Sequence, residues 1–177
     1  MFLDVKELAV RKLRIQKFYP PGTIDYHSED FRQTDVLEVR ATAELVDGQI
    51  RLCGELHTRV ELVCARCLDP VTEEISRDFD LFYRPMDTIR TEEQVQLDEE
   101  EAEVAFFEGA GFFLADALAE QVNLAIPMKA ICRSDCRGLC PQCGANLNHE
   151  DCHCQTHSAD PRLSQLARVK LALCKKQ

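Results

Sequence analysis

The sequence predicts an α+β protein: a small antiparallel β-barrel or sandwich followed by a C-terminal helical, zinc-knuckle-like module. Three stretches alternate apolar and polar residues with the period of a strand, two later stretches carry apolar residues at helical spacing, and eight of the ten cysteines form four close pairs. We therefore expect an antiparallel β domain over residues 1–83, an acidic loop over 84–110, and a helical, cysteine-rich metal-binding module over 111–177. With 177 residues, the chain can bury a core without structural disulfides.

The β domain is predicted by alternating stretches at residues 37–45, 50–64 and 71–83, each with one apolar and one polar face. Half-buried strands of this kind are typical of antiparallel sheets. Asp47-Gly48 follows the first stretch, and this pair favours a tight hairpin because both residues reach positive φ readily. Residues 1–18 are expected to add one or two strands.

Two helices are expected after the loop. The first lies at about residues 113–125, where apolar residues recur at i, i+4 spacing, and Pro127 ends it. The second begins at Asp160, a good N-cap that is followed by Pro161 at the first helical position. Both helices are expected to pack an apolar face into the core.

Charge is unevenly distributed along the chain. The formal net charge is −10; residues 69–103 carry 13 acidic residues and three arginines, whereas residues 128–177 carry eight basic and four acidic residues. This excludes a uniformly basic nucleic-acid coat. The acid run at 98–103 is either a solvated loop or part of a docking strip for a basic partner.

The N-terminus lacks the apolar core of a signal peptide, and no apolar run reaches the ~20 residues that span a bilayer. We therefore expect a cytoplasmic protein without membrane contact. In that reducing compartment, ten cysteines are poor candidates for structural disulfides.

The cysteines near the C-terminus have the spacing of a zinc site. Zinc binds four thiolate or imidazole ligands in a tetrahedron. Cys140 and Cys143 lie in a knuckle that ends at Gly144, and two further thiols, Cys152 and Cys154, follow closely. We predict that these four cysteines form a first metal site.

The remaining close pairs predict a second site at Cys64, Cys67, Cys132 and Cys136. The first pair is expected at a turn between strands and the second pair just after a helix, so the pairs meet if that helix packs on the sheet. The sequence therefore predicts one or two structural Zn²⁺ ions.

Other arrangements of the thiols stay open at this point. Cys136 could replace Cys152 in the first site, and a histidine could replace a thiol; the candidates are His149, His153 and His157. An iron–sulfur cluster or a redox disulfide at Cys64/Cys67 would use the same residue types. Cys53 and Cys174 are expected to be unliganded.

No catalytic motif is present in the sequence. There is no GxSxG, no glycine-rich phosphate loop and no Walker pattern, and the carboxylates are concentrated in the acid run. An all-thiolate metal site has no open coordination position and is a poor Lewis acid. We therefore expect a protein that is not an enzyme.

Several motifs resemble the YceD-type large ribosomal RNA subunit accumulation proteins of bacteria and plastids. They are Cys64-Ala65-Arg66-Cys67-Leu68, the helical segment 118–127, Cys132 with Cys136, the knuckle segment 138–148, Cys152 with Cys154, and Asp160-Pro161-Arg162. The resemblance extends from about residue 36 to 174. It implies a non-enzymatic role in the synthesis, processing or accumulation of large-subunit (23S) ribosomal RNA.

Two binding functions fit that implied role. In the first, the protein binds pre-ribosomal RNA or a large-subunit assembly intermediate through basic residues of its C-terminal part: Lys129, Arg133, Arg137, Arg162, Arg168 and Lys170. In the second, it is an acidic chaperone or adaptor that holds a basic ribosomal protein on the stretch 69–103. A thiol redox or metal-responsive regulator is the least favoured interpretation.

Overall fold

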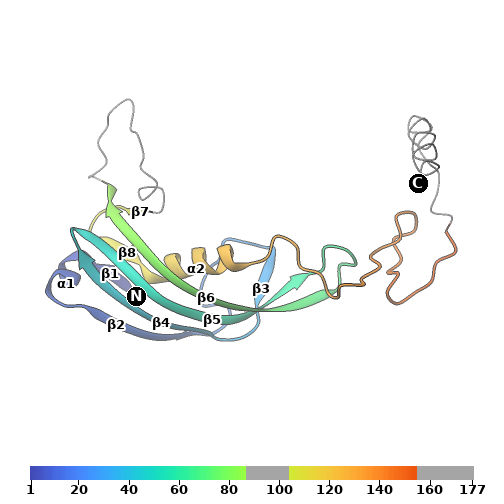
Figure 1. The fold of residues 1–177 in the computed structure, drawn as a ribbon, viewed down its shortest axis with the longest axis horizontal. Helices are drawn as coiled ribbons and strands as arrows, with labels where there is room; N and C mark the ends of the chain where they lie inside the picture. The colour runs from blue at the N-terminus through green and yellow to red at the C-terminus, as the bar shows by residue number, and fades with distance from the viewer. Residues whose placement is uncertain (87–103, 155–177) are drawn as a thin grey trace, which may run out of the picture. The chain divides into compact units, whose positions relative to one another are not determined.

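The computed structural model describes residues 1–86 and 104–154 (Figure 1). Contacts divide the described residues into two units. The first lies within 1–64 and 69–132 and holds the helices and sheets; the second consists of 65–68 and 133–154. Within the described part of the chain, no helix is long and apolar enough to cross a membrane.

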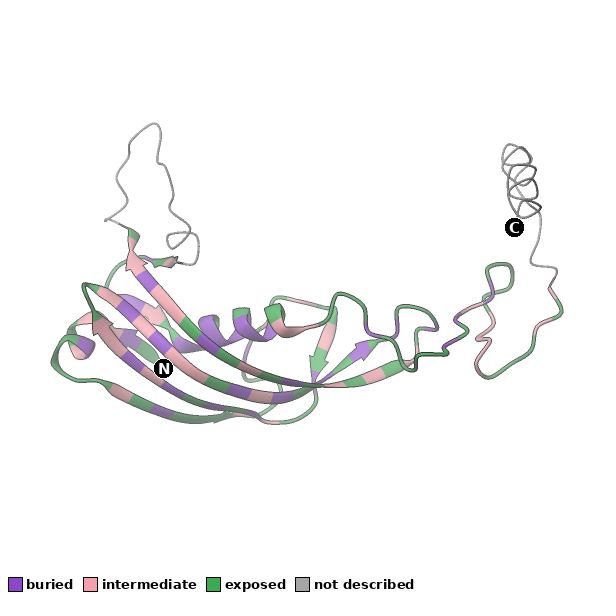
Figure 2. Cartoon of the chain, in the orientation of Figure 1, coloured by how far each residue is buried: buried purple, intermediate pink, exposed green. Residues whose placement is uncertain are grey.

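A six-stranded sheet dominates the first unit, with strand order β2-β4-β5-β6-β7 and β3 paired to β5. Its strands are β2 (Leu13–Tyr19), β3 (Phe31–Gln33), β4 (Leu37–Val46), β5 (Gln49–Val63), β6 (Pro70–Pro85) and β7 (Val104–Phe107). All pairs are antiparallel except β6 with β7. Figure 2 shows buried and exposed residues alternating along β4, β5 and β6, which confirms the three predicted strands.

The sequence predicts a barrel or a sandwich; the sheet is open, so the barrel is wrong. A barrel requires its first and last strands to pair, but among the described residues β2 pairs only with β4 and β7 only with β6. The core instead lies between the sheet and helix α2 (Leu114–Ala125). Because α2 supplies apolar side chains to the sheet, the sheet does not need to curl round on itself to bury its apolar face.

Helix α2 matches the first predicted helix. Leu114, Leu118 and Val122 are fully buried on one side of it, as the i, i+4 spacing predicts. Just before α2, β8 (Gly111–Phe113) pairs with the N-terminal β1 (Phe2–Asp4) in a two-stranded sheet. The predicted terminal helix at Asp160 lies outside the described residues.

Two elements differ from the sequence-based expectation. Residues 1–18 hold, besides strands, the short helix α1 (Val5–Val10), whose N-cap Asp4 accepts a hydrogen bond from the Lys6 backbone N–H at 2.7 Å. The stretch expected as a loop contains β7, which pairs with β6 at Phe82–Pro85. A four-residue parallel strand carries too few alternating positions to be detected from sequence.

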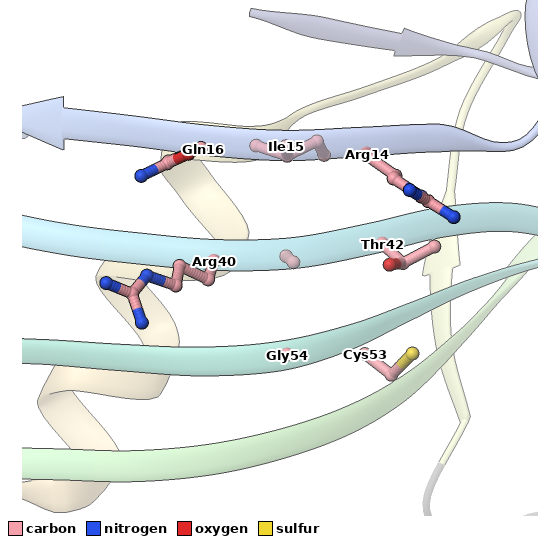
Figure 3. Close-up of a pocket in the computed structure, with 8 residues that line it drawn as sticks. Arg14, Ile15, Gln16, Arg40, Thr42, Cys53 and Gly54 are labelled. Atoms are coloured by element: carbon pink, nitrogen blue, oxygen red, sulfur yellow. The ribbon is translucent and has the colours of Figure 1, made fainter.

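A shallow hollow of about 610 Å³ lies on the sheet across β2, β4 and β5. Figure 3 shows that Arg14, Arg40, Thr42 and Cys53 around it come from these three strands. Gly54 also lines it, at a position where β4 comes close to β5. The hollow therefore lies at a close contact between two strands, and its lining combines polar residues with the apolar Ile15 and Ala41.

Candidate metal centres

The knuckle in the second unit is built by backbone hydrogen bonds. Cys140 N–H donates to the Ala145 carbonyl at 2.8 Å, and Gly144 N–H donates to the Cys140 carbonyl at 2.9 Å. Gly144, directly after Cys143, has a φ of 75°, the left-handed conformation that glycine adopts most readily. Leu139 forms an isolated antiparallel bridge with Asn146, which closes the base of the knuckle.

The four cysteines of the predicted first site come together in this unit. The Sγ atoms of Cys140, Cys143, Cys152 and Cys154 all lie within 4.8 Å of one another. Sulfur ligands about 2.3 Å from a tetrahedral zinc ion lie about 3.8 Å from one another. The four Sγ atoms are thus close enough together to hold one metal ion between them.

The pKa values of these thiols show that a bound cation would stabilise the group. Hydrogen bonds from the backbone N–H groups of Cys143 and Gln142 lower the pKa of Cys140 to about 6. Hydrogen bonding with Cys143, together with desolvation and repulsion from neighbouring thiolates, raises the pKa of Cys154 to about 12. Without a cation, neighbouring thiols cannot all ionise, because each thiolate opposes the next. A divalent metal removes that repulsion and holds all four as thiolates.

The second predicted group is also brought together. The Sγ atoms of Cys64, Cys67, Cys132 and Cys136 all lie within 4.8 Å of one another. The backbone N–H of Cys132 donates to Cys64 Sγ at 3.4 Å. Leu68 directly follows Cys67 and has a φ of 64°, so this pair is followed by a left-handed residue just as Cys143 is.

The structure does not form the alternative ligand sets, in which Cys136 replaces Cys152 or a histidine replaces a thiol. Cys136 lies with Cys64 and not in the knuckle, and neither four-cysteine group among the described residues includes a histidine. Cys53 belongs to neither group and is partly exposed on β5. His157 and Cys174 lie outside the described residues.

Asn148 is a supporting residue that sequence analysis missed. Its side-chain amide donates to Cys136 Sγ at 3.3 Å, and its Oδ1 accepts from the Arg137 backbone N–H at 2.9 Å. Arg66 was missed likewise, and its guanidinium donates to the Cys136 carbonyl at 3.1 Å. Hydrogen bonds to the sulfur or to the backbone of a ligating cysteine orient it toward the metal. Neither residue is a ligand type, so ligand spacing could not reveal them.

Three of the predicted RNA-binding residues lie in the described part of the chain, and all three are exposed: Lys129, Arg133 and Arg137. Arg133 lies 3.4 Å from Asp135 and also donates to Asn148, and Arg137 forms an ion pair with Asp151 at 3.0 Å. The remaining three, Arg162, Arg168 and Lys170, lie outside the described residues.

Comparison with known proteins places these motifs in a family. The sequence profile described as "Large ribosomal RNA subunit accumulation protein YceD" matches residues 52–170. An uncharacterized Mycobacterium tuberculosis protein is 29% identical over 151 residues, covering 85% of this chain and 70% of the relative. A chloroplastic large ribosomal RNA subunit accumulation protein, YCED homolog 1, is 25% identical over 192 residues in Arabidopsis thaliana (96% of this chain, 56% of the relative). Its Zea mays counterpart is 27% identical over 158 residues (76% and 53%). No solved structure matches.

Proposed function

The chain belongs to the YceD family of large ribosomal RNA subunit accumulation proteins, and from that premise we propose that it is a non-enzymatic factor supporting the synthesis, processing or accumulation of large-subunit ribosomal RNA. Structural Zn²⁺ ions hold its C-terminal module, which contacts pre-ribosomal RNA or an assembly intermediate in the cytoplasm. The observation that carries the proposal is the gathering of eight cysteines into two groups of four. A group of four thiolates fills the tetrahedral positions of zinc and leaves none for a substrate or a reactive water.

The metal requirement follows from the small size of the second unit. Its described residues, 65–68 and 133–154, contain one isolated β-bridge and no longer strand or helix. So short a segment buries too little apolar surface to fold on that basis alone, and metal ligation supplies the missing free energy.

Metal counting by native mass spectrometry tests this part of the proposal. We expect two zinc ions in the wild-type protein, one in Cys140→Ser, and two in the matched control Cys53→Ser, because Cys53 lies in neither group. A full complement of zinc in Cys140→Ser would refute the ligand assignment.

RNA contact is proposed for the basic residues of the C-terminal part. Lys129 offers an exposed charge, whereas Arg133 and Arg137 already face carboxylates and so contribute less to phosphate binding. We expect the main contribution from the remaining three: Arg162, Arg168 and Lys170.

A charge-reversal variant tests RNA contact. It carries glutamate at Lys129, Arg162, Arg168 and Lys170; the control variant carries the same number of reversals on the first unit, at Lys6, Arg14, Lys17 and Arg32, all of which are exposed. Loss of four phosphate contacts should weaken binding of a 23S ribosomal RNA fragment and reduce the salt slope by about 4, whereas the control should retain most of its slope. Equal affinity in the reversal variant and the wild type would exclude this RNA-binding surface.

A second candidate function is an acidic adaptor for a basic ribosomal protein, and a specific observation favours it. The described part of the stretch 69–103 is strand β6, which carries Glu73, Glu74, Asp78 and Asp80 along the sheet margin. Deleting residues 92–103 tests the contribution of the acid run: we expect loss of a co-purifying basic protein with RNA affinity unchanged. Recovery of the same protein partners by the deletion variant would rule the acid run out as their docking strip.

A further inference from the structure

One margin of the sheet is unpaired over most of its length. β6 pairs with β5 from Pro70 to Tyr83, but on its other side β7 covers only Phe82–Pro85. Within the described residues, the outer edge of β6 from Val71 to Leu81 therefore has no strand against it. At about 3.3 Å per residue these eleven positions extend about 36 Å. An edge of this kind presents backbone N–H and C=O groups ready to pair with another chain.

A groove lies directly along this edge. It has a volume of about 490 Å³, and its wall is formed by the consecutive residues 77–83 of β6 together with Ala105, Glu120, Gln121 and Leu124. Consecutive strand residues point to opposite faces of a sheet, so a hollow that they line together runs along the strand margin. Figure 1 shows α2 alongside β6 on this side of the sheet. The groove therefore lies where an added strand would meet the N-terminal end of β7, at Val104.

The groove combines an apolar floor with an acidic rim. Phe79 is buried and Leu81 half-buried, and Leu124 of α2 is 60% exposed. Asp78 and Glu120 on the rim are exposed, and neither forms an ion pair with another residue in the described part of the chain. On the α2 side, residues of an added strand would thus meet apolar surface and Glu120, and on the opposite side they would meet Asp78.

The negative charge around the groove determines which kind of partner can bind there. Between Val71 and Leu81, β6 carries four acidic residues and one arginine, and α2 adds Asp116 and Glu120. Nucleic acid would be repelled by this surface. A second copy pairing edge to edge would place the same carboxylates against one another, which is unfavourable for like charges. An extended basic peptide has none of these costs.

We propose that the open edge of β6, from Val71 to Leu81, binds an extended basic segment of a partner protein, which adds to the sheet as a further strand beside α2. The inference rests on the adaptor function, which is the second candidate above, and does not depend on RNA binding or metal. Backbone pairing supplies affinity, and the apolar floor and acidic rim select alternating apolar and basic side chains.

A designed probe tests the proposal on the full-length, metal-loaded protein. The probe is a capped, fluorescein-labelled octapeptide of alternating lysine and valine, measured at low micromolar concentration by fluorescence anisotropy. We expect slowed amide hydrogen exchange at alternate residues between Val71 and Leu81 when it binds. Two N-methylated analogues, blocked either at all lysine or at all valine amides, should differ, because only one edge of an added strand faces β6.

Variants at the acidic rim of the groove provide a second test of the proposal. Asp78→Lys with Glu120→Lys should weaken the probe about tenfold, while the control Glu29→Lys with Glu38→Lys, which also reverses two exposed acidic residues, should stay within about twofold. Equal effects of the two double variants, equal binding of the two methylated analogues, or protection of the same amides by a ribosomal RNA oligonucleotide or by self-association would overturn the proposal. If the probe fails while deletion of 92–103 still releases a basic partner, the edge site is wrong and the adaptor function stands.

Discussion

A methyl group added at position 54 tests how closely β4 and β5 approach each other. Gly54 on β5 is in register with Ala41 on β4. A Cβ atom at Gly54 would lie 2.6 Å from the Ala41 Cα and 2.7 Å from the Ala41 Cβ. Ordinary carbon contacts are about 3.5–4.0 Å. The obstructing atoms belong to the backbone or are attached directly to it, so no side-chain rotation relieves the overlap.

Gly54→Ala must therefore push β4 and β5 apart locally. Overpacking lowers the free energy of unfolding by about 1–3 kcal/mol. Replacing glycine by alanine also reduces the entropy of the unfolded chain, which stabilises the protein by at most about 0.4–1 kcal/mol. We expect a net loss of about 2 kcal/mol in the free energy of unfolding. Adding Ala41→Gly removes one of the two overlapping carbons, so the double variant should regain part of this loss, and the two changes should be non-additive.

Urea unfolding followed by far-ultraviolet circular dichroism measures these changes, since the chain has no tryptophan. The midpoint should fall without a change in slope. Cys53→Ala serves as the control, because Cys53 points to the opposite face from its buried neighbour Leu52, and its stability should change by no more than about 0.5 kcal/mol. Wild-type stability in Gly54→Ala would show that β4 and β5 are not held this close, and the strand geometry would need revision.

Three further outcomes are expected. Leu118→Ala, at a fully buried position of α2, should lower the free energy of unfolding by about 3–5 kcal/mol in the same urea assay. Arg51 donates to both carboxylate oxygens of Asp80 and lowers the pKa of that group. The resulting stability is present above the unfolded pKa of about 3.9 and is lost as pH falls. Asp80→Asn should therefore cost less than about 1 kcal/mol at neutral pH, because the pair is exposed, and nothing near pH 2. Excess chelator should speed proteolysis within residues 133–154 while leaving the sheet intact by circular dichroism; equal cleavage rates with and without chelator would argue against a structural metal.

Local periodicity predicts the strands and α2 of this protein well, but it does not predict how the sheet ends. Alternation along β4, β5 and β6 reports one buried face per strand, and a barrel and an open sheet covered by a helix produce the same pattern. The choice depends on what covers that face, which is here the apolar side of α2. The sequence did not predict β7, because this strand is only four residues long and pairs with β6 in parallel.

Ligand chemistry makes the cysteine groups easier to predict than the basic surface. Short spacings place Cys140 near Cys143 and Cys64 near Cys67 whatever the rest of the chain does, and a tetrahedral ion needs two such pairs, so few groupings remain. Arginines carry no comparable constraint. Arg137 counts as a free cation in the sequence, yet it faces Asp151 at 3.0 Å. A net charge of +4 over residues 128–177 therefore overstates the charge available to phosphates. By contrast, Asp78 on β6 and Glu120 on α2 have no ionic partners in the described part of the chain. For this reason the structure gives stronger physical support to recognition of a basic peptide than the sequence alone does.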